Sequence, residues 1–147
     1  MPSPHRVREI AKYEAGNTTV KAVTSAGATL VAADSGKLVV ADITGGDTAI
    51  VLPAAQVGLT YRIVVWKSDS GNDDLTVATA AATSLFKGGV IHSDSNADNV
   101  SVQADFSNDD LWTFVDAEVG TDVTFICDGT HWYTTGVVMS DTVPTIG

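Results

Sequence analysis

Asp122 to Gly136 reads D-V-T-F-I-C-D-G-T-H-W-Y-T-T-G, and this stretch decides the fold class of the chain. Val123–Cys127 is rich in β-branched and aromatic residues, and His131–Thr135 is a second run of the same kind. Asp128-Gly129 stands between the two runs. Because glycine readily adopts the positive φ that a tight turn needs, this arrangement predicts a β-hairpin. We expect its aromatic residues to pack in a sheet, with a ligand platform as the alternative.

Short β-favouring runs separated by turn residues continue along most of the 147-residue chain. Their spacing of about 8 to 12 residues is typical of a β-sandwich or a jelly roll. We expect Gly88-Gly89 to divide 85–91 into two short strands, as at a bulge. The other predicted strands are 19–23, 28–31, 37–42, 48–52, 59–67, 75–78, 100–104 and 111–115.

The sequence therefore predicts an all-β protein, an antiparallel β-sandwich or jelly-roll-like domain with an irregular N-terminal arm. We place the arm at 1–16, the β domain at 17–138 and an extended C-terminal tail at 139–147. The arm contains two prolines followed by basic residues, which favours a short helix over 7–15 or a disordered terminus. Tyr61 and Trp132 lie in β runs with apolar neighbours, so we expect both to be buried.

The charge of the chain is large and uneven. The formal net charge is −10. Residues 1–21 contain four basic and two acidic residues, a net of +2, so the remaining 126 residues carry −12. Such a body repels phosphates, so we expect no nucleic-acid partner. No apolar run reaches the length of a membrane span, so we also expect no membrane partner. Cys127 is the single cysteine, which is compatible with synthesis in a reducing cytoplasm.

The chain shows no pattern of catalytic or metal-binding residues. His5, His92 and His131 are far apart and lack metal-ligand spacing. Cys127 and His131 could form a nucleophile–base pair, but a cysteine at the end of an apolar run usually behaves as a small hydrophobe. A β-sandwich hydrolase or lyase would need clustered residues that are absent from the sequence. We therefore expect a protein that is not an enzyme, without catalytic residues, cofactor or metal.

One loop partly follows the spacing of a calcium-binding loop. Asp94, Asn96 and Asp98 alternate, and Asp105 stands at the twelfth position counted from Asp94. The pattern departs from the motif at Asn99, where glycine is expected, and at Asp105, where a bidentate glutamate is expected. We expect an ordinary solvated loop, with an ion site as the alternative.

Three motifs in order give the chain a family resemblance. The first is Leu30–Asp34 with Gly36, a strand followed by a D-x-G turn. The second is Leu52–Tyr61, which reads L-P-x-A-x-x-G-x-x-Y, and the third is Asp128–Tyr133, which reads D-G-x-x-W-Y. Together they resemble a module of tailed-bacteriophage structural proteins, found in capsid decoration (cement or head-fibre) proteins and in some tail-fibre parts. The resemblance covers about residues 18–136.

This resemblance implies a structural virion protein that binds the outer surface of the phage head and bridges neighbouring capsomers. Its partners would be the major capsid protein and itself, most simply as a homotrimer, with a dimer left open. A tail-fibre or receptor-binding module that recognises host glycans is the alternative. The arm has no counterpart in the module. Because its charge is opposite to that of the body, we interpret Arg6, Arg8 and Lys12 as capsid-contact candidates.

Overall fold

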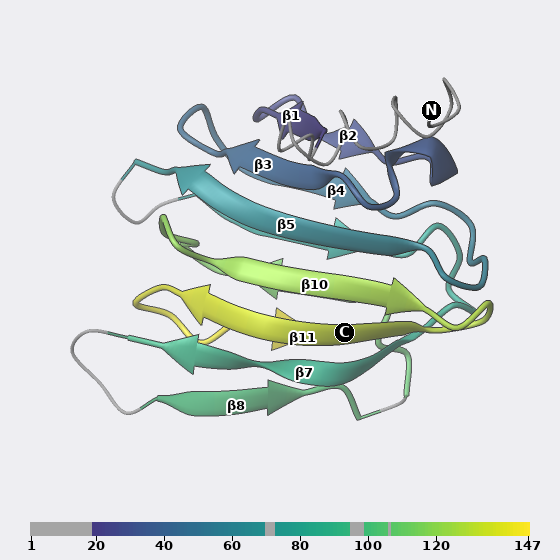
Figure 1. Ribbon diagram of the computed structural model, residues 1–147. Helices are drawn as coiled ribbons and strands as arrows, with labels where there is room; N and C mark the ends of the chain where they lie inside the picture. The colour runs from purple at the N-terminus through teal and green to yellow at the C-terminus, as the bar shows by residue number, and fades with distance from the viewer. Residues whose placement is uncertain (1–18, 70–72, 95–98, 106) are drawn as a thin grey trace, which may run out of the picture.

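The fold is a sandwich of two β-sheets, as seen in the computed structural model (Figure 1). The structure describes residues 19–69, 73–94, 99–105 and 107–147. The predicted arm, 1–16, therefore lies outside the described residues. The strands are β1 (Val20–Val23), β2 (Ala28–Thr29), β3 (Leu38–Asp42), β4 (Thr48–Val51), β5 (Thr60–Lys67), β6 (Leu75–Ala78), β7 (Phe86–Ser93), β8 (Val100–Gln103), β9 (Leu111–Phe114), β10 (Asp122–Cys127), β11 (Trp132–Met139) and β12 (Thr145–Ile146), with a 3₁₀ turn at Ala32–Asp34.

The large sheet has the strand order β1-β3-β5-β10-β11-β7-β8, and the small sheet has the order β12-β9-β6-β4-β2. The all-β sandwich prediction is confirmed, but both sheets are mixed and not antiparallel throughout. From β1 to β6 the chain alternates between the sheets, so each return to a sheet places a strand parallel to the one before it. β11 also runs parallel to β7. The sequence reveals strands but not this alternation, which is why direction was missed.

The predicted hairpin is present as β10 and β11, in antiparallel register from Asp122↔Val137 to Cys127↔Trp132. Gly129 has φ +102, as the Asp-Gly signal requires. The Asp128 carboxylate accepts hydrogen bonds from the backbone N–H groups of Thr130 (2.8 Å) and His131 (2.7 Å), which lowers the pKa of that carboxyl. The turn is therefore held by both glycine and aspartate.

Two predicted boundaries are wrong. β7 runs without interruption from Phe86 to Ser93, so Gly88-Gly89 lies inside one strand and does not divide two. The tail predicted at 139–147 belongs to the domain, because β12 pairs with β9 and Ile146 packs against the core. The Gly147 carbonyl also accepts a hydrogen bond from the Leu111 N–H (2.8 Å). A two-residue strand carries too little alternation to be recognised from sequence.

The core between the sheets is aromatic and aliphatic. Tyr61 and Trp132 are fully buried, as predicted, and their ring centroids are 5.8 Å apart. The Tyr61 hydroxyl donates a hydrogen bond to the Val31 carbonyl (2.9 Å), which satisfies its polar end inside the protein. Other large side chains that are fully buried are Trp112, Phe86, Phe114, Phe125, Leu30 and Ile63.

Candidate functional site

The outer face of the seven-stranded sheet carries exposed apolar side chains. Successive residues of a strand point to opposite faces, so the residues next to a buried core position in the same strand project outward. The outward side chains of Trp66, Ile91, Ile126, Tyr133 and Val137 are 39–49% exposed. The register places two pairs side by side, Val137 with Ile91 and Ile126 with Tyr133. Thr124 and Thr135 lie between these pairs, and Trp66 stands two residues after Val64, the partner of Asp122 on β5. We call these five residues the apolar face.

Charged side chains on this side of the sheet have close partners. Arg62 donates to both carboxylate oxygens of Asp122, with an Nε–Oδ1 distance of 2.9 Å. This hydrogen bonding and the attraction to the carboxylate raise the pKa of Arg62. Lys67 lies over the Trp66 ring, with Nζ 4.4 Å from the centroid. The Arg62–Asp122 ion pair therefore lies among the residues of the apolar face, where its two charges neutralise one another.

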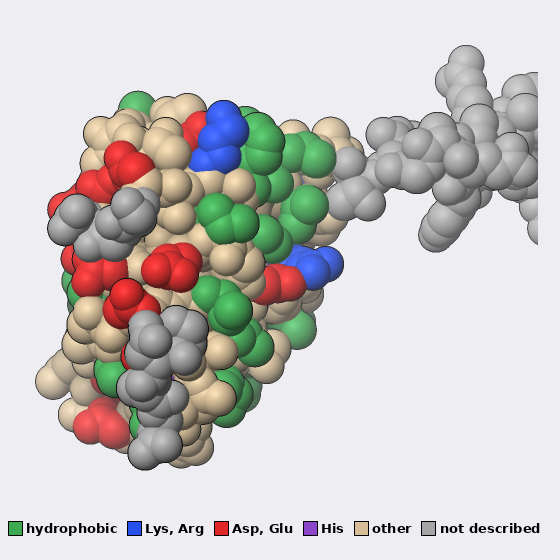
Figure 2. Space-filling model, turned by 90° about the vertical axis from the view of Figure 1, so that its left-hand side faces the viewer, with side chains coloured by type: hydrophobic (Ala, Val, Ile, Leu, Met, Phe, Trp, Pro, Cys, Tyr) green, Lys and Arg blue, Asp and Glu red, His purple; other side chains and the backbone are tan. Residues whose placement is uncertain are grey.

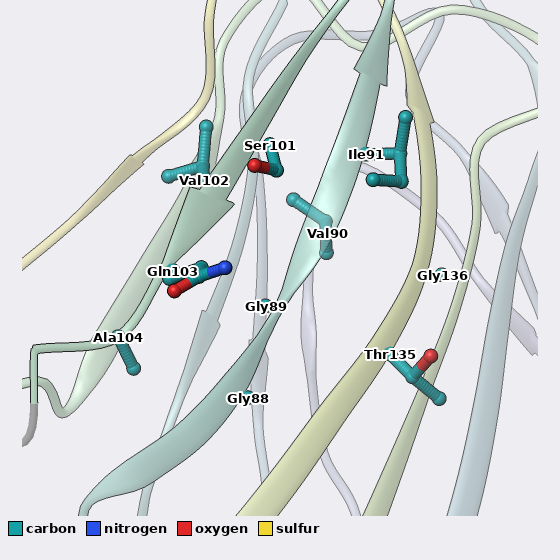
Figure 3. A pocket seen from close by; sticks show the side chains of 10 residues that line it. All are labelled: Gly88, Gly89, Val90, Ile91, Ser101, Val102, Gln103, Ala104, Thr135 and Gly136. Atoms are coloured by element: carbon teal, nitrogen blue, oxygen red, sulfur yellow. The ribbon is translucent and has the colours of Figure 1, made fainter.

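A hollow of about 420 Å³ lies beside the apolar face, over β7, β8 and β11 (Figure 3). Two glycines, Gly88 and Gly89, form part of its lining. Both positions require glycine, because a Cβ at Gly88 would collide with the Thr134 carbonyl and a Cβ at Gly89 with the Val102 carbonyl. No lining residue is charged. The residues are Gly88, Gly89, Val90, Ile91, Ser101, Val102, Gln103, Ala104, Thr135 and Gly136.

Carboxylates gather at one end of the sandwich, where β3, β5, β7 and β11 finish. Figure 2 shows this end, with Asp and Glu side chains over much of it. The pKa of Asp73 is raised, because it shares a hydrogen bond with Asp69 and lies near further carboxylates. The residues in or beside the loops of this end are Asp42, Asp47, Asp69, Asp73, Asp74, Asp94, Asp116, Glu118 and Asp141.

Several of these carboxylates hold the loops together. Asp47 Oδ1 accepts a hydrogen bond from the Asp74 N–H (2.9 Å), and Asp74 Oδ1 accepts one from the Asp116 N–H (2.9 Å). Asp116 Oδ2 then accepts one from the Thr142 hydroxyl (3.0 Å). Asp116 has φ +48, a conformation that aspartate tolerates better than most residues. This series of contacts links four loops, so part of the acidic end has a structural role.

The predicted capsid-contact candidates Arg6, Arg8 and Lys12 lie outside the described residues, as do Asn96 and Asp98 of the calcium-like loop. Asp94 directly follows the strand β7, whereas Asp105 comes two residues after the end of β8. The Asp94 N–H donates to Asn99 Oδ1 (3.2 Å), and Asp105 Oδ1 accepts from the Ser107 N–H (2.8 Å). Within the described ranges, no group of three His, Cys, Asp or Glu side chains could hold a metal ion.

The cysteine of the possible nucleophile–base pair is a core residue. The Cys127 thiol is buried in the core, where its sulfur accepts a hydrogen bond from the Gly129 N–H (3.3 Å). His131 follows the turn, and its backbone is bound by Asp128. His92 is buried elsewhere, with Nε2 2.9 Å from the Ser140 carbonyl oxygen. These positions leave Cys127 as a core side chain.

No protein-family model and no curated protein matches this chain. In the part of the chain that the structure describes, no helix is long and apolar enough to cross a bilayer. The function of the protein must therefore be inferred from its own residues and their arrangement.

The apolar face was missed at the level of sequence. Apolar residues stand on both faces of the hairpin strands, with Phe125 inward and Ile126 outward, and with Trp132 inward and Tyr133 outward. A strand that is apolar on both faces needs cover on both faces. The apolar residues on both faces of these strands were therefore the sequence signal for an exposed apolar surface, because the small sheet covers only one face of this strand pair.

Proposed function

We propose that this protein is a structural virion protein, a decoration or cement protein that binds the outer surface of a tailed-phage head. The observation that carries the proposal is the apolar face. Its five large apolar side chains are 39–49% exposed on one sheet face, and exposed apolar surface of this kind is a candidate contact site with another protein. The motifs of the family resemblance support the major capsid protein as the partner and the virion as the location, after synthesis in the host cytoplasm.

The charge distribution supports one orientation for this binding. The described part of the chain begins at the end of the sandwich opposite the carboxylate-rich loops, since β1 runs parallel to β3 toward that acidic end. The arm residues Arg6, Arg8 and Lys12 therefore come before a strand that starts at the less acidic end of the sandwich. In the proposal, the acidic end faces solvent, and the apolar face and the arm contact the shell. Repeated contacts with capsomers then stabilise the head, with self-association as a trimer or a dimer.

The test compares two double variants, each of which replaces two exposed apolar side chains by serine. Ile126→Ser with Val137→Ser changes the apolar face, and Val57→Ser with Val143→Ser changes exposed valines elsewhere. We expect shells assembled without this chain to bind the first variant at least tenfold more weakly than wild type. The second variant should bind normally. Equal binding of all three proteins, each with an unchanged melting temperature, would remove the apolar face from the mechanism.

A receptor-binding module is the second candidate, and one observation favours it. Trp66 and Tyr133 are 49% and 45% exposed on one sheet face, where a sugar ring could stack on them. In that case Trp66→Ala should abolish adsorption to host cells and leave shell binding unchanged. If the protein is a decoration protein, Trp66→Ala should instead weaken shell binding and leave adsorption to host cells unchanged.

A further inference from the structure

The large sheet ends in an edge strand that lacks the usual protection. β8 pairs with β7 on one side only, and its sequence is Val100-Ser101-Val102-Gln103. Edge strands are normally blunted by charged residues, prolines or short length, because an open edge pairs with other strands. β1, at the other edge of this sheet, carries Lys21, and the edge strands of the small sheet have two residues each. β8 contains neither a charge nor a proline.

The backbone of β8 presents hydrogen-bonding groups outward. Ala104 N–H donates to the Gly88 carbonyl (2.9 Å), and the antiparallel register continues through Val102↔Val90 and Val100↔His92. Alternate residues of an antiparallel strand direct their N–H and C=O to the same neighbour. Val100, Val102 and Ala104 therefore bond to β7, and Ser101 and Gln103 direct their backbone groups away from the sheet.

The side chains of this edge form two stripes. Val100, Val102 and Ala104 share the side of buried Val90, and Val100 is 39% exposed. Ser101 and Gln103 are exposed on the other side, beside the hollow (Figure 3). The segment thus alternates apolar and polar residues symmetrically about Val102.

We propose that β8 pairs with β8 of a second copy, antiparallel, around a two-fold axis at Val102. Ser101 then lies opposite Gln103 of the second copy, and each such pair exchanges two backbone hydrogen bonds. Val102 faces the Val102 of the second copy, and Val100 faces Ala104, so apolar side chains meet apolar side chains. The partner strand is identical in sequence and complementary to itself, which is the signature of an isologous contact.

Charge also favours a second copy at this place. Each chain carries a formal net charge of −10, so two copies repel one another unless they meet on an uncharged surface. β8 and the lining of the hollow contain no charged residue. The pairing deepens the proposed function by naming the contact between copies. It favours a dimer over the trimer that the family resemblance implies.

The test is the mass in solution of Ser101→Pro, with Ser101→Thr as its matched control. Proline removes the backbone N–H of residue 101, which points away from β7, and edge strands tolerate proline at such positions. Two four-residue strands should bury less than the roughly 800 Å² per partner of a standard interface, so sedimentation should be followed up to about 100 µM. Wild type and Ser101→Thr should sediment as dimers, and Ser101→Pro as a monomer with an unchanged circular dichroism spectrum.

A second variant keeps the test decisive if Ser101→Pro does not fold. Ser101→Lys with Gln103→Lys places ammonium groups opposite one another across the axis and changes only exposed side chains. It should be monomeric at low salt and regain part of the dimer at high salt. A wild-type monomer, a trimer, or a folded Ser101→Pro dimer would overturn the pairing. A monomer that still binds shells would leave the proposed function standing, and a β8-paired dimer that fails to bind shells would contradict only that function.

Discussion

The aromatic rings of Tyr61 and Trp132 lie 5.8 Å apart in the core and join two strands on either side of β10. Both side chains are fully buried. Trp132→Ala would leave a cavity between the sheets, so we expect a loss of about 3–5 kcal/mol in the free energy of unfolding. Urea denaturation measures this loss. An unchanged unfolding midpoint would show that the packing assignment is wrong.

Asp34 gives the fold a dependence on acid pH. Its carboxylate is 5% exposed and lies 2.7 Å from the Lys37 ammonium, and this hydrogen bond is the main cause that lowers the pKa of Asp34 below 3.8. A lowered folded-state pKa stabilises the protein above the unfolded-state value, and that stability is lost as pH falls through the folded-state value. Asp34→Asn should therefore cost about 1–3 kcal/mol at pH 7.

The same comparison at low pH supplies the control. The difference in unfolding free energy between wild type and Asp34→Asn should shrink as pH falls from 3.8 through the lower folded-state pKa of Asp34, because the native carboxyl becomes neutral over that range. Asp141→Asn, at an exposed position, should change stability by less than about 0.5 kcal/mol. A difference for Asp34→Asn that stays constant from pH 7 to pH 2 would contradict the role of its charge.

Alanine substitutions at two glycines with nearly equal φ angles distinguish the cost of backbone strain from the cost of a steric collision. Gly36 has φ +81 and open space around it, whereas Gly88 has φ +83 and the Thr134 carbonyl of β11 in the way. Alanine at Gly36 should cost about 1–2 kcal/mol, the penalty of the left-handed region. Alanine at Gly88 should cost clearly more, because β7 and β11 must also move apart. Equal melting temperatures for the two variants would refute the collision.

The N-terminal arm should contribute to shell binding through its charge. A protein lacking residues 2–15 should fold and self-associate, but it should bind shells more weakly. The loss should be largest at low salt, where the charges of Arg6, Arg8 and Lys12 are least screened. Binding assays at several salt concentrations measure this dependence. Equal occupancy by full-length and truncated protein at every ionic strength would assign the arm no role.

The hairpin could be predicted from sequence because its signals are local. The Asp128-Gly129 turn and the run Leu75–Ala78 need only their own residues to be recognised, and the predicted strand 75–78 matches β6. Gly88-Gly89 was misread because glycine weakens strand propensity. In the fold, the backbones of β11 and β8 come so close to β7 that only glycine fits, and that reason lies in distant segments of the chain.

The candidate site could be predicted only in part, for a related reason. Val64 and Trp66 of β5 are apolar residues on the outward side of an interior strand, and the sequence indicates a central strand there. Which face stays uncovered depends on the width of the second sheet, which has fewer strands. The pairing of Ile126 with Tyr133 depends on register, and no single strand carries that information.

The position of the protein in the virion tests the proposed function most directly. Under the proposed function a phage encodes this chain, and its virions would be labelled with an antibody against the chain and imaged by electron microscopy. The copies per particle would be counted by quantitative mass spectrometry. A decoration protein predicts label over the whole head and a copy number comparable with that of the capsomers. Label confined to the tail tip with a few copies per particle, or no label on virions at all, would contradict the proposal.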